Sequence, residues 1–217
     1  ATHGWGLVRL MTLFARIART IAYAHQQGFI HRDLKPDNTM LGEFGEVTVM
    51  DWGLAKPVGA AEAASAAPSA RVRIGGGRFD TADGEVTGTP QYMPPEQARG
   101  DVKALGPRAD IYSLGAVLYE LLTLEPPFDG QNPRRIREAV VNEAVVPPSQ
   151  RAPDRNIPHP LEELCLHCLR KRPEERPASA AWVADRVEAF LEGERDRARI
   201  AAERDRWMVE GRAAADA

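Results

Sequence analysis

The chain has 217 residues, of which 43% are hydrophobic and 27% are charged, and its formal net charge is −3 at pH 7. This length and apolar content predict a globular protein that buries roughly 70% of its unfolded surface. The slightly acidic balance argues against a nucleic-acid partner, because such partners need a basic surface. No apolar run reaches the roughly 18 residues of a membrane span, and the chain does not begin like a signal peptide, so we expect no span within it.

The first predicted element is a helix near residues 7–27. Apolar side chains recur there at helical spacing, and Gly28 follows as a stop signal. The residues of this apolar face are Leu7, Leu10, Met11, Phe14, Ile17, Ala18, Ile21 and Ala24.

The next segment carries two motifs, with short strands expected between them near residues 39–41 and 47–50. Residues 31–38 read His-Arg-Asp-Leu-Lys-Pro-Asp-Asn, and residues 51–53 read Asp-Trp-Gly. Phosphoryl transfer needs a carboxylate that orients and deprotonates the attacking hydroxyl, a cation on the moving phosphate, and oxygen ligands that hold magnesium. The side chains that match these needs are Asp33, Lys35, Asn38 and Asp51.

Together these motifs resemble the catalytic loop and the magnesium-binding motif of eukaryotic-type protein kinases. The resemblance implies that Asp33 accepts the proton of the substrate hydroxyl and that Lys35 steadies the transferred phosphate. It also implies ATP as the phosphate donor and Mg²⁺ held by Asn38 and Asp51. A lysine two residues after the aspartate resembles the serine/threonine branch of the family, so we expect an alcohol as the acceptor.

A kinase also needs a glycine-rich loop over the phosphates, a strand lysine and a helix glutamate, and none of these precedes His31. The glycine run at residues 75–77 follows the catalytic motifs and is better interpreted as a flexible loop. The resemblance therefore implies a mainly α fold with a small β component, the large (C-terminal) lobe of a kinase domain, over residues 1–192. We expect the small lobe to be missing, the chain alone to be inactive, and the uncovered apolar face to favour self-association.

The segment after Asp51 has low complexity, and we expect it to be mobile. In kinases with an arginine before the catalytic aspartate, phosphate on this segment commonly bonds that arginine, here Arg32. Thr87 is the favoured phosphate acceptor. The weaker candidates are Thr81, Ser69 and Ser65.

Residues 88–96 read Gly-Thr-Pro-Gln-Tyr-Met-Pro-Pro-Glu and resemble the end of a kinase activation segment, with the pocket for the acceptor residue. The resemblance implies that Thr89 hydrogen-bonds toward the catalytic aspartate and lysine. It also implies that Glu96 pairs with a later arginine, for which Arg176 has the expected position. Breaking such a buried pair would cost about 3–5 kcal/mol, whereas two unrelated surface charges, the alternative, would matter little.

An apolar run after Asp110 predicts a buried helix near residues 107–123, because it lacks a polar face. The resemblance implies that Asp110 accepts backbone hydrogen bonds from the loop around His31 and Arg32. The alternative is a charge that favours the first turn of its own helix.

Further helices are expected near residues 133–142, 160–170 and 179–192. Cys165 and Cys168 lie in the second of these, and we interpret them as reduced core thiols. A zinc site, the alternative, would require a second pair of ligands elsewhere.

Residues 193–217 turn to Arg, Glu, Asp and Ala, and they predict a solvated, charged helical tail with a thin apolar stripe too short for a coiled coil. In bacterial multidomain kinases of similar sequence such a helix often leads to a membrane span or a repeat domain. Residues 93–98, Met-Pro-Pro-Glu-Gln-Ala, also resemble bacterial kinases. We therefore expect a cytoplasmic location, either free or as the cytoplasmic part of a membrane-anchored kinase.

Two functions remain open from the sequence. The first is an ATP- and magnesium-dependent kinase that phosphorylates Ser and Thr residues of protein substrates in bacterial signalling. The second is a kinase-like lobe that binds or scaffolds without catalysis. The four intact catalytic side chains favour the first, and the missing nucleotide-clamping motifs favour the second for the chain by itself.

Overall fold

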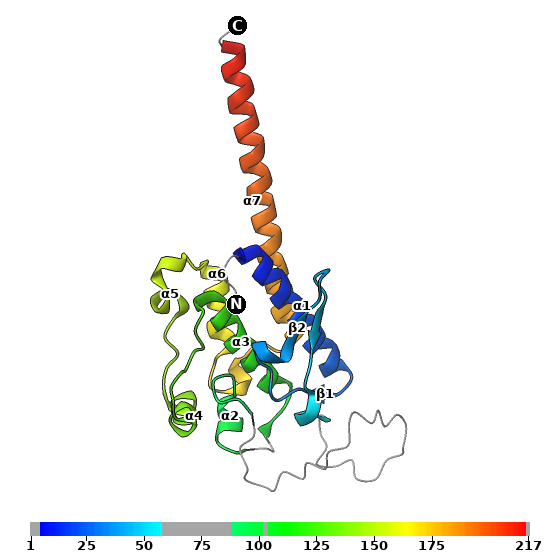
Figure 1. Cartoon of the computed structure of the whole chain (residues 1–217), viewed down its shortest axis with the longest axis vertical. Coiled ribbons are helices and arrows are strands. Elements are labelled where there is room, and N and C mark those ends of the chain that lie inside the picture. Colours follow the sequence, from blue (N-terminus) through cyan, green and yellow to red (C-terminus); the bar gives the residue numbers. More distant parts are fainter. Residues whose placement is uncertain (1–4, 58–87, 102–103, 216–217) are drawn as a thin grey trace.

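The computed structural model of the chain describes residues 5–57, 88–101 and 104–215, with side chains as far as residue 208. Helices dominate this part of the chain, and the strands are short (Figure 1). The helices are α1 Leu7–Gln26, α2 Pro95–Ala98, α3 Pro107–Thr123, α4 Pro133–Asn142, α5 Pro148–Arg151, α6 His159–Cys168 and α7 Ala180–Ala215. The strands are β1 Phe29–Ile30, β2 Thr39–Leu41, β3 Val47–Val49 and β4 Lys56–Pro57.

The strands form two separate antiparallel pairs. β2 pairs with β3 in a hairpin in which Met40 lies opposite Thr48, and β1 pairs with β4. Short 3₁₀ turns at Pro36–Asn38 and Trp52–Leu54 flank the hairpin on its two sides. The hairpin therefore brings the two sequence motifs to its open end.

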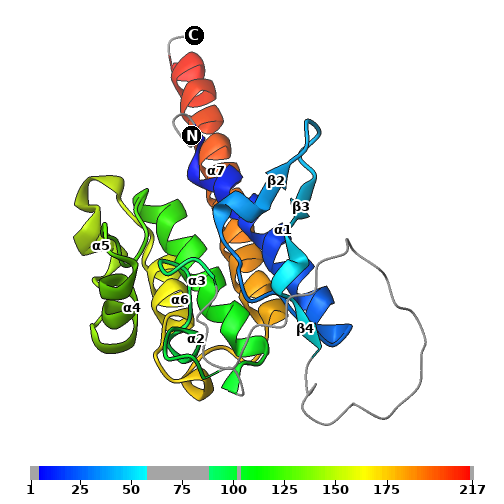
Figure 2. The same ribbon diagram turned by 60° about the horizontal axis from the view of Figure 1, so that its bottom comes forward.

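The core surrounds α3, which packs against α1 and α6, while α1 also lies along α7 (Figures 1 and 2). Every residue of α3 from Ala109 to Tyr119 is buried, as expected for a run without a polar face. The closest approach to α6 is at Gly115, where an added Cβ would lie 2.6 Å from the Cβ of Cys168. A fully buried large side chain contributes roughly 1.5–3 kcal/mol, so this central helix is a major source of stability.

The predicted helices and hairpin strands are confirmed within one or two residues. α1 ends where the sequence predicts, because Gly28 takes a left-handed conformation with φ of 80°. The main difference is α7, which runs without a break through the predicted end near residue 192. Gly193 is accommodated inside this helix, and ion pairs such as Arg197–Glu194 lie along its exposed surface.

The far end of α7 extends away from the body of the protein (Figure 1). Ile200, Trp207 and Met208 are exposed there. Among the described residues, no helix is long and apolar enough to cross a membrane.

Both cysteines are buried free thiols, as the sequence predicts. Burial raises the pKa of Cys168 to about 12 and that of Cys165 well above its usual value. Both thiols are therefore protonated core groups at neutral pH.

Candidate active site

The site is built on the loop that precedes the β2–β3 hairpin, and Asp110 holds this loop in place. The Asp110 carboxylate is fully buried and accepts hydrogen bonds from the backbone N–H groups of His31 (2.8 Å) and Arg32 (2.9 Å). Its Oδ2 also lies 2.8 Å from Nε2 of His25, a contact that the sequence did not indicate. These bonds hold Arg32 at a φ of 73°, which is unfavourable for a residue with a side chain.

The ring of His31 joins this loop to the hairpin. The Asp33 backbone N–H donates to Nδ1 of His31 at 3.3 Å, so the other ring nitrogen, Nε2, carries the proton and donates to the Met50 carbonyl at 3.0 Å. The ring also packs against Trp52, with ring centroids 4.6 Å apart. One side chain thus contacts both the residue at position 33 and the two neighbours of Asp51.

Asp33 is the centre of the polar contacts. Its side chain is only 10% exposed, and its Oδ1 accepts a hydrogen bond from the Thr89 backbone N–H at 2.9 Å. Nζ of Lys35 lies 3.3 Å from Oδ2 of Asp33 and donates to the Thr89 hydroxyl at 2.8 Å. The structure therefore brings together three of the residues singled out in the sequence.

Asn38 and Asp51 lie at the ends of β2 and β3. Asn38 is buried, and its Nδ2 donates to the Asp33 carbonyl at 2.8 Å, while its backbone carbonyl accepts from the Met50 N–H. Its side-chain Oδ1 forms no hydrogen bond with the described residues. Asp51 is exposed and has a left-handed backbone, and a Cβ at Gly53 would lie 3.2 Å from its Oδ1, so the glycine leaves room around this carboxylate.

The donor set of Asn38 and Asp51 fits a magnesium ion. Mg²⁺ prefers oxygen ligands, keeps several waters and takes one or two protein carboxylates beside the phosphates of a substrate. In the parts of the chain that the structure describes, no group of three or more His, Cys, Asp or Glu side chains gathers as a transition-metal site would. The oxygen donors of Asn38 and Asp51 thus suit a hard cation such as Mg²⁺.

The segment after Gly88 forms the wall beside Asp33. Gly88 has a φ of 123°, and a Cβ there would lie 2.8 Å from Nε2 of Gln97, so a larger residue would push against the wall. Nε2 of Gln97 donates to the Arg32 carbonyl at 2.9 Å and ties this segment to the loop. No sequence feature indicated the role of Gln97, because an isolated glutamine has no distinctive pattern.

Tyr92 extends the same wall toward α3. Its hydroxyl donates to Glu120 at 2.5 Å, and its carbonyl accepts from the Ser113 hydroxyl at 2.8 Å. Burial, followed by the hydrogen bond to Glu120, raises the pKa of Tyr92 well above its usual value. Tyr92 is thus a neutral hydrogen-bond donor at any physiological pH.

Behind this wall lies a buried ion pair between Glu96 and Arg176. The two side chains form a bidentate contact of 2.7 and 2.8 Å, with Arg176 fully buried and Glu96 5% exposed. Arg176 also donates to three carbonyls, those of Arg108, Arg170 and Lys171. The pair therefore fixes the start of α2 against the chain that follows α6.

Arg32 retains an unused donor. Its Nη1 donates to the Leu54 carbonyl at 3.3 Å, but its buried Nε has no hydrogen-bond partner among the described residues. Burial lowers the pKa of this guanidinium, an effect that Asp110 partly offsets. The candidate phosphate acceptors, Thr87, Thr81, Ser69 and Ser65, and the glycine run at 75–77 lie outside the described residues.

Comparison with known proteins identifies a family and several relatives that are similar to this chain. The protein kinase domain family matches residues 8–187. The chain is similar to the serine/threonine-protein kinase PknD of Protochlamydia amoebophila, with 36% identity over 190 residues that cover 88% of this chain and 19% of that protein. It is also similar to the serine/threonine-protein kinase PknB of Mycobacterium leprae, with 40% identity over 169 residues that cover 78% of this chain and 24% of that protein. The chain thus spans about a fifth to a quarter of the length of these relatives.

Proposed function

This chain belongs to the protein kinase family, and we propose that it provides the catalytic centre of a bacterial protein serine/threonine kinase. The reaction transfers the γ-phosphate of ATP to Ser and Thr hydroxyls of protein substrates. The observation that carries this proposal is the contact set in which Thr89 joins Asp33 and Lys35. It puts a carboxylate, a cation and the wall of an acceptor pocket at one point.

We assign the base to Asp33 and the phosphate-steadying cation to Lys35. The Thr89 N–H and the Asn38 amide hold the Asp33 carboxylate in one orientation, so it can accept the proton of a substrate hydroxyl without reorganising. Lys35, already bonded to the Thr89 hydroxyl, lies 3.3 Å from the same carboxylate. The lysine two residues after the aspartate and the similarity to serine/threonine-protein kinases support Ser and Thr as acceptors.

Asn38 and Asp51 would hold Mg²⁺, and ATP would be the phosphate donor. When bound, the metal neutralises the charge of the phosphates and the nucleotide supplies the transferred group. The chain's contribution is to present the Asn38 oxygen and the Asp51 carboxylate from adjacent ends of one hairpin. Because ATP is the donor, we also infer a cytoplasmic site of action.

We infer further that residues 1–192 act as the large lobe of a kinase domain and that residues 193–217 are a charged helical tail. No glycine-rich loop, strand lysine and helix glutamate precede His31, so these nucleotide-clamping groups would come from outside this sequence. Exposed apolar side chains on α1, β1 and the β2–β3 hairpin support a missing partner. They are Val8, Tyr23, Phe29, Met40, Leu41 and Phe44.

Arg32 is proposed to bind a phosphate on the segment that includes Thr87. The unpartnered Nε of Arg32 supports this role, because a buried guanidinium donor gains most from a charged acceptor. Self-association of the chain through its exposed apolar face also stays a prediction.

The test is Asp33→Asn in the complete protein, with transfer of radiolabelled phosphate from ATP to a protein substrate as the readout. Loss of the general base should lower kcat about 10²- to 10⁴-fold. Asp37→Asn is the matched control, because Asp37 lies in the same loop but is exposed, and it should retain most of the activity. Equal transfer by the Asp33→Asn variant and the unaltered protein would refute the catalytic assignment.

The second candidate is a kinase-like lobe without catalysis. The exposed apolar face and the missing clamping motifs favour it for the chain by itself. Calorimetry of ATP and Mg²⁺ binding, with the chain alone and with the complete protein, separates the two candidates. Binding only by the complete protein supports the kinase, and a complete protein that neither binds ATP nor transfers phosphate supports the scaffold.

A further inference from the structure

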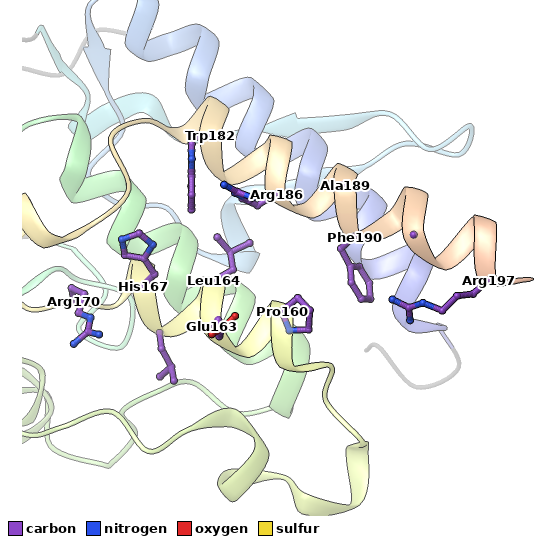
Figure 3. Close-up of a pocket in the computed structure, with 12 residues that line it drawn as sticks. Pro160, Glu163, Leu164, His167, Arg170, Trp182, Arg186, Ala189, Phe190 and Arg197 are labelled. Atoms are coloured by element: carbon purple, nitrogen blue, oxygen red, sulfur yellow. The ribbon is translucent and has the colours of Figure 1, made fainter.

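A wide hollow lies away from the catalytic loop, between α6 and α7 (Figure 3). It is an open groove of about 800 Å³, within the usual size range of ligand sites. None of the residues that line it belongs to the proposed catalytic centre. Its role is therefore independent of the proposed function.

The floor of the groove is apolar. Leu164 of α6 and Phe190 of α7 lie there with only 5% and 8% exposure, and Pro160 lies between them along the groove (Figure 3). At one end the ring of Trp182 meets His167 edge to face, with centroids 5.5 Å apart. The two helices thus hold rigid apolar side chains around a concave space, as in sites that receive an apolar side chain of a partner.

The rim of the groove is positively charged. Arg170 and Arg197 lie toward its opposite ends, and Arg186 stacks over Trp182 at 4.8 Å between them (Figure 3). Arg197 is paired with Glu194, and the only acidic residue of the lining is Glu163.

Two of these arginines have no counter-charge. Neither Arg170 nor Arg186 forms a side-chain ion pair or hydrogen bond among the described residues. Arg19, between α1 and α7, differs in that it bonds two carboxylates. An anionic partner would supply the charge that the groove lacks.

We propose that this groove docks an acidic peptide segment of a partner protein, with a leucine or aromatic side chain of that segment on the apolar floor. The acidic side chains would pair with Arg170 and Arg186, and the apolar side chain would cover Leu164 and Phe190. A peptide fits better than an anionic membrane surface, because the apolar side chains are recessed in a concavity and do not protrude. A lipid surface would require protruding apolar groups on a flat or convex face.

The test uses fluorescein-labelled synthetic peptides and the 217-residue chain, with fluorescence anisotropy as the readout. The first probe combines glutamates with two leucines, the second replaces both leucines by serine, and the third replaces the glutamates by lysine. We expect saturable binding of the first probe at micromolar concentrations and at least tenfold weaker binding of the other two. The binding should weaken as NaCl increases, because the arginines are partly exposed.

Arg186→Glu should weaken binding of the first probe at least tenfold, and Ala189→Trp should weaken it by filling the groove from an exposed position of α7. Arg155→Glu is the matched control, because Arg155 is an exposed arginine outside the groove, and it should bind like the unaltered chain. Circular dichroism verifies that each variant is folded. In ¹H–¹⁵N NMR spectra the indole signal of Trp182, identified with Trp182→Phe, should shift when the peptide binds.

Three results would overturn the proposal. The first is no saturable binding of the acidic leucine peptide, and the second is equal binding by the Arg186→Glu and Arg155→Glu variants. The third is stronger binding to vesicles of anionic phospholipid than to the peptide, lost in Arg186→Glu, which would identify a membrane-facing surface.

Discussion

The Glu96–Arg176 pair and the cluster of Arg19 with Asp185 and Glu188 contain the same chemical groups at similar distances, but in different surroundings. The first pair is almost completely removed from water, with contacts of 2.7 and 2.8 Å. In the second, the three side chains remain 43–61% exposed, with contacts of 2.5 and 2.6 Å. Distance alone therefore does not rank them.

Burial changes the consequence of losing a partner. In the exposed cluster, water replaces a lost partner at little cost, and salt screens what attraction there is. In the buried pair, a remaining carboxylate would be left without solvent or counter-charge. Arg176 in addition satisfies three backbone carbonyls, so its loss leaves several polar groups unpaired at once.

The largest effect is expected from Arg176→Ala. It should lower the free energy of unfolding by about 3–5 kcal/mol, because it leaves Glu96 as an uncompensated buried charge. Urea denaturation followed by circular dichroism measures this change. Arg172→Ala is the matched control, since Arg172 is an exposed arginine in the same loop, and should change stability by less than about 0.5 kcal/mol. Similar losses of unfolding free energy in the two variants would show that burial does not make the Glu96–Arg176 pair more important than exposed charges.

Buried elements could be predicted from the sequence where a pattern of neighbouring residues identifies them. The apolar period of α1 and the continuous apolar run of α3 specify their buried faces, and both helices are confirmed. Lys35 and Asn38 could be selected with Asp33 because their motif is contiguous, and the structure brings them into contact with it. Their catalytic roles stay predictions.

Features that depend on how distant segments pack could not be predicted. The contact of Gln97 with the Arg32 carbonyl links residues far apart in sequence through one common side chain. The groove between α6 and α7 exists only after the two helices have packed, and nothing in either sequence segment marks it. The sequence predicts a helix near residues 179–192 and a helical tail from residue 193, but it does not show that they form one continuous helix. Gly193 and the change to charged residues resemble a helix end, whereas the exposed ion pairs permit the helix to continue.

Lys171 is intermediate in burial between the Glu96–Arg176 pair and the exposed Arg19 cluster, and its lowered pKa predicts a pH dependence of stability. Its side chain is half-buried, donates to the Val140 carbonyl and lies 4.5 Å from the Phe128 ring centroid, and burial lowers its pKa from 10.5 to about 8. Between about pH 8 and 10.5 the unfolded chain therefore binds more protons than the folded one, so the stability contribution of Lys171 rises with pH in this window and is constant below it.

We expect the stability difference between the unaltered chain and Lys171→Met to shift in favour of the unaltered chain as pH increases from 7 to 10. The shift should be less than about 1 kcal/mol, because water screens a half-exposed group. The two proteins are compared at each pH by urea denaturation. The difference between them removes the effect of tyrosine ionisation on stability, including that of Tyr119, whose pKa is raised to about 12 mainly by burial. A difference that is flat across this range would show that Lys171 titrates as an exposed lysine does.

The smallest effect is expected from Arg19→Ala, which removes the cluster that joins α1 to α7. Its free energy of unfolding should fall by about 0.5 kcal/mol in low salt and by almost nothing near 1 M NaCl, where the Debye length is about 3 Å. A double-mutant cycle with Glu188→Gln measures the coupling energy directly and removes effects that each change has alone. The geometry of this cluster is as favourable as that of the buried pair, because Arg19 contacts both carboxylates at 2.6 Å or less. A coupling above about 2 kcal/mol that persists in high salt would therefore mean that contact geometry, and not burial, separates strong from weak ion pairs in this protein.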